Sequence, residues 1–160
     1  MALARGESIR RLKRVARLLA SQTTLALATT NADGTPHVTP LFYFPGDDLA
    51  LYWFSSTNSR HSRNLKRQPE AAVTVYLPVV KWRGIRGVQM RGAAGVLTDP
   101  ERRMHIAAAY AARFQLGPAL RSVLSRSRLY EFRPAWVRYL DNSVRFGYRF
   151  EITLAAPHSR

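Results

Sequence analysis

The first regular pattern in the chain has the period of an α-helix. Between residues 7 and 21, apolar side chains recur every three or four positions, and arginines occupy much of the remaining surface. The apolar positions are Ile9, Leu12, Val15, Ala16 and Leu19. This spacing predicts an amphipathic helix over residues 7–21.

The pattern changes at Thr23, where apolar and polar positions begin to alternate as they do in β-strands. Short runs rich in Val, Leu, Thr and aromatic residues then recur, separated by turn-forming residues. The expected strands cover residues 23–30, 37–44, 49–55, 71–77, 88–97, 129–140 and 144–154. Short turns at residues 31–34 and 45–48 join the first three, which predicts an antiparallel meander.

Helices are expected between some of these strands. One begins among residues 56–59 and ends near Arg67. Another begins where Asp99 precedes Pro100, a favoured start for a helix, and continues to about Phe114. Gly117 and Pro118 break it, and a shorter helix is expected to run through Val123. Sequential antiparallel strands with helices at their margins predict a mainly β fold, a closed or nearly closed barrel. No repeat or linker divides the chain, so we expect one domain over residues 1–160, with 155–160 as a loose tail.

Composition narrows the chemistry that the chain can carry. The sequence contains no cysteine, which excludes disulfides, thiolate metal sites and a cysteine nucleophile. Its four histidines lack the spacing of metal ligands, so we expect no metal site. Neither a signal peptide nor an apolar stretch long enough to span a membrane is recognisable, and we expect a cytoplasmic protein without membrane contact.

The charge is unusually positive. The chain has 25 Lys and Arg against 10 Asp and Glu, for a net charge of +15. Such a field attracts nucleic acid, anionic lipid, or a phosphorylated cofactor or substrate, and net charge does not choose among them. An equally good interpretation is that most of these arginines lie on solvated faces.

The most informative segment covers residues 55–64, where an aromatic strand enters a helix. It gathers serine hydroxyls, Arg60 and His61 at the positive end of the helix dipole. Arginine is suited to bidentate contact with a phosphate, and His61 can supply a further hydrogen bond. The pattern is compatible with a phosphate site, although taken alone it favours an ordinary capped helix with a solvated basic face.

Several stretches, taken in order, resemble the pyridoxamine phosphate oxidase-like FMN-binding split barrels. They are residues 24–37, 40–43, the Ser-Ser-x-x-Ser-Arg-His motif at 55–61, and 68–75. The chain is most similar to a bacterial subgroup without an assigned substrate, through Trp82, Ile85, Arg86, Gly87, Gln89, Asp141, Asn142, Phe146 and Gly147. The resemblance implies a six- to seven-stranded antiparallel split barrel with flanking helices that binds FMN as a homodimer.

The resemblance also assigns roles to individual residues. It implies that the phosphate and ribityl chain are held by Ser55, Ser59, Arg60 and His61. The isoalloxazine edge would face Pro40, Leu41, Phe42 and Phe54, and the partner chain would bring Gly87, Gln89 and Trp136. For Trp136 and Phe54, a place in the barrel core is an equal alternative. Gln89 is a stronger candidate, because a polar residue between apolar neighbours on a strand needs a partner.

Two departures argue against the vitamin B6 reaction. True pyridoxamine phosphate oxidases carry Arg and Lys on the second strand, near the places of Thr39 and Phe44, and an Arg-Leu-His-type motif where this chain has residues 143–146. We therefore expect a flavin-dependent oxidoreductase acting on a different small molecule, which the positive field would allow to be anionic. No catalytic side chain can be nominated.

Two alternatives remain. The same fold would serve another cofactor, the deazaflavin F420 or haem. From another class, the chain would be a non-enzymatic barrel that binds nucleic acid or another polyanion. The basic and aromatic residues of 81–86 suit that function, although a strand edge kept soluble by charge is the favoured interpretation.

Overall fold

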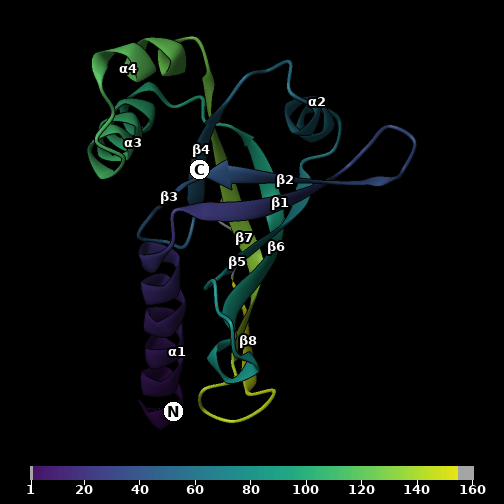
Figure 1. The fold of residues 1–160 in the computed structure, drawn as a ribbon, viewed down its shortest axis with the longest axis vertical. Coiled ribbons are helices and arrows are strands. Elements are labelled where there is room, and N and C mark those ends of the chain that lie inside the picture. The colour runs from purple at the N-terminus through teal and green to yellow at the C-terminus, as the bar shows by residue number, and fades with distance from the viewer. Residues whose placement is uncertain (1, 155–160) are drawn as a thin grey trace.

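A computed structural model describes residues 2–154, so the expected tail at 155–160 lies outside the described residues. The helices are α1 (Ala2–Ser21), α2 (Arg60–Arg67), α3 (Pro100–Arg113) and α4 (Pro118–Ser125), with one 3-10 turn, η1 (Trp82–Gly84). The strands are β1 (Thr24–Thr30), β2 (Pro36–Phe42), β3 (Phe44–Pro45), β4 (Leu51–Ser55), β5 (Glu70–Tyr76), β6 (Arg86–Val96), β7 (Arg128–Asp141) and β8 (Arg149–Thr153). Figure 1 shows α2 and the α3–α4 pair flanking one end of the curled sheet, while α1 runs beside its other end.

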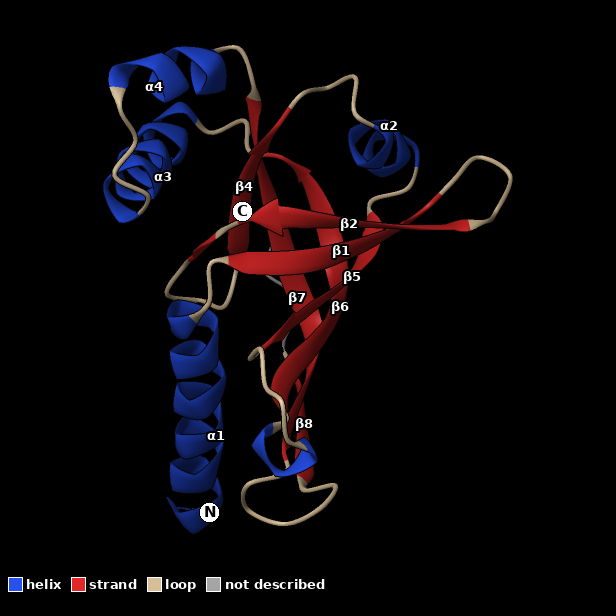
Figure 2. Cartoon of the chain, in the orientation of Figure 1, coloured by secondary structure: helices blue, strands red, loops and turns tan. Residues whose placement is uncertain are grey.

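All eight strands belong to one antiparallel sheet (Figure 2). Its order is β2-β1-β5-β6-β7-β4-β3, and β8 pairs with β7 outside this path. The 14-residue β7 pairs with β4 over its first part and with β8 over its second, while β6 runs along its other edge. The mainly β class, a curled antiparallel half-barrel with flanking helices, is confirmed.

The core fills the inside of the curl. Strand residues alternate, so that Leu25 and Leu27 of β1 are buried while the residues between them are less so. Val15 and Leu19 of α1 close this core from one side. No helix within residues 2–154 is long and apolar enough to cross a membrane.

A bulge bends the sheet where β6 passes β7. The register shifts between Arg91 and Gly92. A Cβ at Gly92 would lie 2.0 Å from the carbonyl oxygen of Arg133, so only glycine fits this close approach of two strands.

The expected meander is wrong. The segment 37–44 is not one strand, because it breaks at Tyr43 into β2, which pairs with β1, and β3, which pairs with β4. Tyr43 turns into the core, where its hydroxyl donates to the carbonyl of Leu19 at 2.6 Å and its amide donates to Thr23. This buried anchor sends the chain from one end of the sheet order to the other.

Two other boundaries differ from expectation. Helix α1 begins at Ala2 rather than at residue 7. Residues 144–148 form a turn instead of the start of a strand, since the Gly147 amide donates to Asn142 Oδ1 at 3.0 Å and β8 begins only at Arg149.

Candidate functional site

A compact hydroxyl–imidazole cluster lies at the start of α2. His61 Nε2 is 2.7 Å from Ser55 Oγ and 3.0 Å from Ser59 Oγ. Ser59 is also the N-cap of α2, and its hydroxyl accepts from the amide of Ser62 at 3.3 Å. Three of the four residues expected to hold a phosphate are thus brought together at one helix N-terminus.

His61 is kept neutral by its surroundings. Its side chain is 6% exposed. Burial lowers the pKa of the imidazole below its ordinary value of 6.5, and the nearby His37 lowers it further. His61 therefore acts in this cluster as a hydrogen-bonding group rather than as a cation.

The two arginines of the motif differ in their surroundings. Arg63 donates to the carbonyl of Asn58, which holds it against the preceding loop. Arg60 is exposed, and no hydrogen bond or ion pair of its guanidinium occurs within the described residues. The pKa of Asp33 is lowered, chiefly by a hydrogen bond from Thr35, and Arg60 contributes a smaller electrostatic effect. Arg60 is thus the free cation beside the cluster.

Helix α2 is anchored to β1, and to the residue that follows this strand, by polar contacts of Asn64 and Arg67. Asn64 Nδ2 donates to Thr29 Oγ1 at 3.1 Å and to Asn31 Oδ1 at 3.0 Å. Arg67 donates to the carbonyl of Thr30 at 2.6 Å. These bonds fix the N-terminus of α2 relative to the sheet.

The outer face of the sheet carries three of the other predicted residues, Pro40, Gln89 and Trp136, in two rows that cross the strands. Following the β-pairing from β2 to β7, the first row contains Pro40, Ala26, Thr74, Gln89 and Arg138. The second contains Val38, Ala28, Ala72, Arg91 and Trp136. Small residues therefore form a floor between an apolar edge at β2 and a polar edge at β6 and β7.

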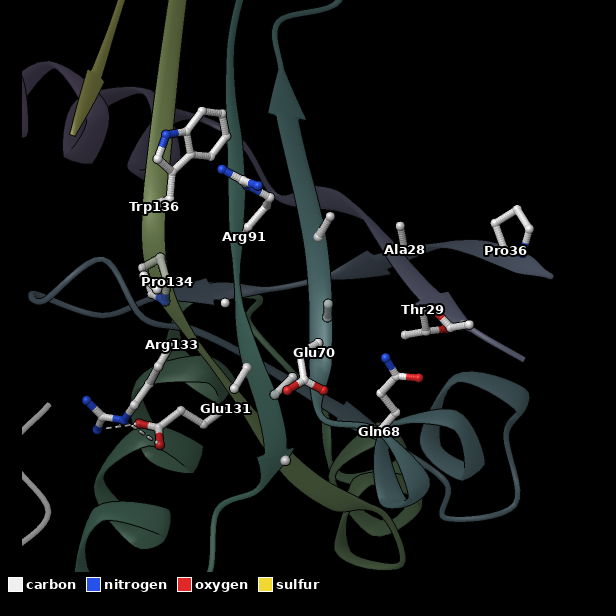
Figure 3. Close-up of a pocket in the computed structure, with 18 of the residues that line it drawn as sticks. Ala28, Thr29, Pro36, Gln68, Glu70, Arg91, Glu131, Arg133, Pro134 and Trp136 are labelled. Atoms are coloured by element: carbon white, nitrogen blue, oxygen red, sulfur yellow. Dashed lines mark hydrogen bonds and ion pairs between the residues drawn. The ribbon is translucent and has the colours of Figure 1, made fainter. Parts of the chain in front are cut away.

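This floor belongs to a large open groove. Its main part has a volume of about 950 Å³ and runs from Pro36 and Thr29 to Arg133 and Trp136. Figure 3 shows Trp136 beside Arg91 at one end, and Glu131 with Arg133 at another. An adjoining hollow of about 400 Å³ extends this groove to Gln89.

The structure corrects the argument made for Gln89 and excludes the core alternative for Trp136, while their contact with a cofactor stays a prediction. Gln89 is exposed, because its apolar neighbours point into the core, so it needs no partner within the chain. Trp136 is not in the core either. The guanidinium carbons of Arg91 and Arg138 lie 4.4 Å and 5.1 Å from the centroid of its ring, and its Nε1 donates to Glu151 at 3.3 Å. Both residues are presented on the outer face.

Gly87 is explained by packing within the sheet. A Cβ at this position would lie 3.2 Å from the Cβ of Tyr76 and from the carbonyl oxygen of Val75. Gly87 occupies the same strand as Gln89, two residues earlier, and so lies on the same face.

Pro40, Leu41, Phe42 and Phe54 are brought together by the structure, but far from Gln89. They line a pocket of about 470 Å³ against α3 and α4. Phe54 is half-buried: it packs against the smaller core cluster that contains Tyr52 and Leu129, and its ring also meets Tyr110. Since three strand spacings separate Pro40 from Gln89, about 14 Å lies between them in one chain.

The walls of that pocket from α3 and α4 were missed by the sequence analysis. They include Tyr110, Phe114, Leu116 and Leu120. The only local signal was the aromatic pair Tyr110 and Phe114, four residues apart and therefore on one face of a helix.

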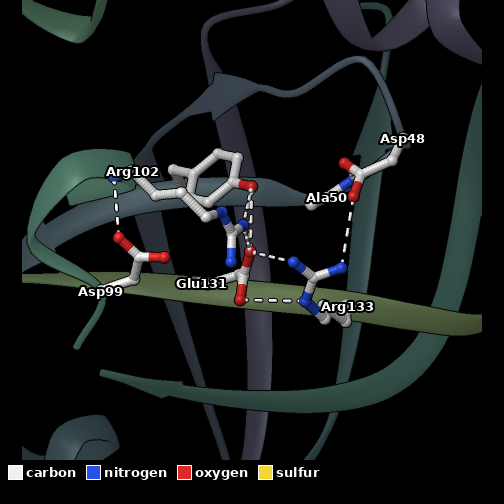
Figure 4. A network of polar contacts seen from close by, with 7 residues as sticks. Asp48, Ala50, Asp99, Arg102, Glu131 and Arg133 are labelled. Atoms are coloured by element: carbon white, nitrogen blue, oxygen red, sulfur yellow. Dashed lines mark hydrogen bonds and ion pairs between the residues drawn. The ribbon is translucent and has the colours of Figure 1, made fainter. Parts of the chain in front are cut away.

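A charged network holds α3 in place (Figure 4). Glu131 accepts from Arg102, from Tyr52 at 2.9 Å and from Arg133 at 2.8 Å. Arg133 also pairs with Asp48 at 3.3 Å. Burial, followed by the hydrogen bond to Glu131, raises the pKa of Tyr52 to about 12, so its hydroxyl stays protonated. This network joins α3 to β4 and β7 and thereby positions the pocket wall.

No cluster of three or more metal-ligating side chains occurs among residues 2–154. His158 lies outside the described part of the chain.

Known proteins support the fold. The UPF0306 protein plu4501 of Photorhabdus laumondii is 24% identical over 131 residues, which are 82% of this chain and 87% of that protein. A conserved hypothetical protein of Mycobacterium tuberculosis superposes with a TM-score of 0.72 at 18% identity, over 92% of this chain and 93% of that chain. The haem storage protein HutZ of Vibrio cholerae superposes with a TM-score of 0.65 at 20% identity, over 76% of this chain and 88% of that one.

The family match covers most of the sheet as well as α2. Residues 12–141 match the family described as pyridoxamine 5'-phosphate oxidase. This chain therefore belongs to the pyridoxamine 5'-phosphate oxidase family.

Proposed function

We propose that the chain binds FMN between two copies of itself and acts as a flavin-dependent oxidoreductase on a small molecule. The observation that carries this proposal is the cluster of Ser55, Ser59 and His61 at the N-terminus of α2, with Arg60 free beside it. This is the mixture of donors that a phosphate monoester requires.

The donors fit a phosphate in number and in charge. The first amides of a helix have no partner inside the helix, so those of Arg60 and His61 are available to an anion. A phosphate monoester carries about two negative charges near neutral pH. Arg60 supplies a full positive charge and the helix dipole a partial one, while neutral His61 positions the hydroxyls of Ser55 and Ser59 through its Nε2.

A second copy would complete the site. Within one chain Gln89 lies about 14 Å from Pro40, too far for both to touch the same ring edge. Val38 is 61% exposed and Phe42 60% exposed, beside the alanine floor of the outer face. An exposed apolar surface of this kind is typical of an interface. A two-fold arrangement would bring Gly87, Gln89 and Trp136 of one copy toward the Pro40–Phe42 edge of the other.

When bound, the flavin supplies hydride or electron transfer. The chain's residues then bind and orient it: the α2 cluster holds the phosphate, and the backbone of 40–42 faces the ring. Phe54 and its aromatic neighbours limit the access of water to one side. No side-chain acid or base is assigned.

Haem is the second candidate, because HutZ shares the fold. Haem iron takes an axial ligand such as histidine. Among the described residues, no histidine lines the outer groove or the pocket beside α3 and α4, and His61 Nε2 already contacts two serines. FMN therefore fits these residues better. F420 would use the same phosphate site, and a polyanion would use the arginines spread over the surface.

The test compares FMN with riboflavin, which lacks the phosphate. Each compound is titrated into the purified protein, and binding is measured by the quenching of flavin fluorescence. FMN should bind at least about 30-fold more tightly, which corresponds to one charge-assisted phosphate contact of about 2 kcal/mol. Equal affinities would contradict the phosphate site. A Soret band on adding haem, without any flavin binding, would favour the haem candidate.

A further inference from the structure

The pocket beside α3 and α4 shares Pro40, Leu41, Phe42 and Phe54 with the proposed flavin site, but the FMN proposal assigns no ligand to the pocket itself. Its volume of about 470 Å³ is within the range of small-molecule sites. One wall comes from β2 and β4 and contains Phe42 and Phe54; the other comes from α3 and α4.

Four aromatic rings form a continuous wall. Phe54 and Tyr110 meet edge to face with centroids 5.1 Å apart, and Tyr110 and Phe114 lie 4.7 Å apart. Phe114 then meets Phe42 at 5.5 Å with an interplanar angle of 67°. Rings held edge to face leave neighbouring ring faces open to a further aromatic group. At the mouth, Phe42 is 60% and Leu120 48% exposed, so the wall is reachable from solvent.

The pocket contains one side-chain hydrogen-bond donor and no charge. No lysine, arginine, aspartate or glutamate is among its described lining residues, although the chain carries a net charge of +15. The donor is the hydroxyl of Tyr110, which is 3.5 Å from the carbonyl of Phe42, a distance at the outer limit of hydrogen bonding. Burial raises the pKa of Tyr110 to about 12, so this hydroxyl keeps its proton at neutral pH.

We propose that this pocket binds a neutral, planar aromatic carbonyl compound of the quinone class. The ring would lie against Phe42 and Phe114, and a carbonyl oxygen would accept from the Tyr110 hydroxyl. An anionic substrate, which the positive field would suggest, finds no cation among the lining residues. Arg113 and Arg121 contact Phe114 and Leu116 from outside the lining, and both already donate to backbone carbonyls. The inference that this compound is the substrate rests on the proposed flavin site, because Pro40, Leu41 and Phe42 border both the pocket and that site. The inference that the pocket binds the compound does not depend on the flavin.

The test uses menadione, a neutral methylated naphthoquinone, with its sulfonated naphthoquinone analogue as the anionic control. The absence of cysteine removes thiol addition as a side reaction of such probes. Binding is measured by calorimetry and by saturation-transfer NMR on the full chain, and FMN is titrated in parallel. Menadione should bind at least about tenfold more tightly than the sulfonate, since burying an unpaired charge is costly.

A pair of substitutions on α4 distinguishes an effect on the pocket from a general effect on the helix. Leu120→Gln places a polar amide at the mouth and should weaken menadione binding about fivefold or more, because apolar contact area is lost. Ser122→Gln places the same side chain two residues further along α4, outside the lining residues, and should leave binding unchanged. Tyr110→Phe keeps the ring and should weaken binding about three- to tenfold through the lost hydrogen bond.

The proposal would be overturned if menadione and the sulfonate bound with equal affinity. It would also be overturned if Leu120→Gln and Ser122→Gln changed menadione affinity equally. Menadione binding with these variant effects supports it even if FMN fails to bind, in which case only the flavin site is wrong. FMN binding without menadione binding leaves the flavin site standing and removes the quinone pocket.

Discussion

The polar cluster of α2 and the apolar pocket of α3 and α4 meet in the strand β4. Ser55 contacts His61 in the polar cluster, while its neighbour Phe54 lies against Tyr110 in the apolar pocket. On one side, hydroxyls, an imidazole and a free arginine suit a charged phosphate. On the other, four aromatic rings and one hydroxyl suit a neutral ring. The alternation of a single β-strand thus separates two binding chemistries within a few ångströms.

The two regions also differ in the contacts that fix their helices to the sheet. Helix α2 is fixed to β1 through the side chain of Asn64, whereas α3 is fixed by the charged network around Glu131, outside the pocket. Substitutions in the polar cluster should therefore affect phosphate binding without changing the pocket, and the reverse should also hold.

The largest effect is expected from Arg60→Ala. Loss of the free arginine beside the α2 cluster should weaken FMN binding by about 2–3 kcal/mol, or roughly 30- to 150-fold. Arg63→Ala is the matched control, because Arg63 is occupied with the carbonyl of Asn58. Fluorescence titration compares the two, and menadione binding should be unchanged in both. Equal effects of the two substitutions would show that the phosphate does not lie beside Arg60.

A smaller effect is expected from Asn64→Leu. It leaves Thr29 and Asn31 without the buried amide that joins α2 to β1. The free energy of unfolding should fall by about 1–3 kcal/mol, measured by urea denaturation, and FMN affinity should fall with it. Lys66→Leu, on an exposed position of the same helix, is the control. Unchanged stability of Asn64→Leu would mean that the anchor is unimportant.

The pH dependence of stability is expected to be moderate and to originate in His61. Its pKa in the folded protein is lowered below 6.5, so below that pH the unfolded chain takes up a proton that the folded chain resists. The free energy of unfolding should therefore decrease as the pH falls through 6.5 toward the lower folded pKa. Its slope from this group is at most about 1.4 kcal/mol per pH unit. His61→Gln should flatten the slope, whereas replacing the exposed His105 should not; identical slopes would refute the assignment.

The smallest effect is expected from salt. FMN carries about two phosphate charges, so its affinity should change less than about tenfold between about 50 and 200 mM salt. A polyanion engaged by six or more basic residues would lose about three orders of magnitude over the same range. A nucleic-acid complex that survives 200 mM salt, measured by fluorescence anisotropy, would favour the polyanion alternative.

Local sequence was sufficient for the polar cluster but not for the apolar pocket. Ser55, Ser59 and His61 are close in sequence, and the serine N-cap fixes their geometry, so a short motif identifies them. The pocket instead requires contact between Phe42 and Tyr110, which are 68 residues apart. Such a contact depends on which strands pair, and local patterns do not specify this.

The same reason explains the errors on individual residues. The break at Tyr43 depends on a bond to Leu19 of α1, which nothing between residues 37 and 44 reveals. The polarity of Gln89 was read as a need for a partner, although alternation with Val88 and Met90 already places it outside. For Trp136, the core and a flavin contact were equal alternatives, and the structure excludes the core, because the ring lies on the outer face against Arg91 and Arg138.

The central claim is that each flavin site is formed by residues of both copies of the chain in a dimer. Sedimentation velocity at micromolar protein, recorded at both the protein and the flavin absorbance, tests it most directly. We predict a dimer carrying one FMN per chain, and a larger dimer fraction with FMN than without it, because a ligand of the assembled form shifts the equilibrium by mass action. A monomer that carries FMN at full occupancy would contradict the account.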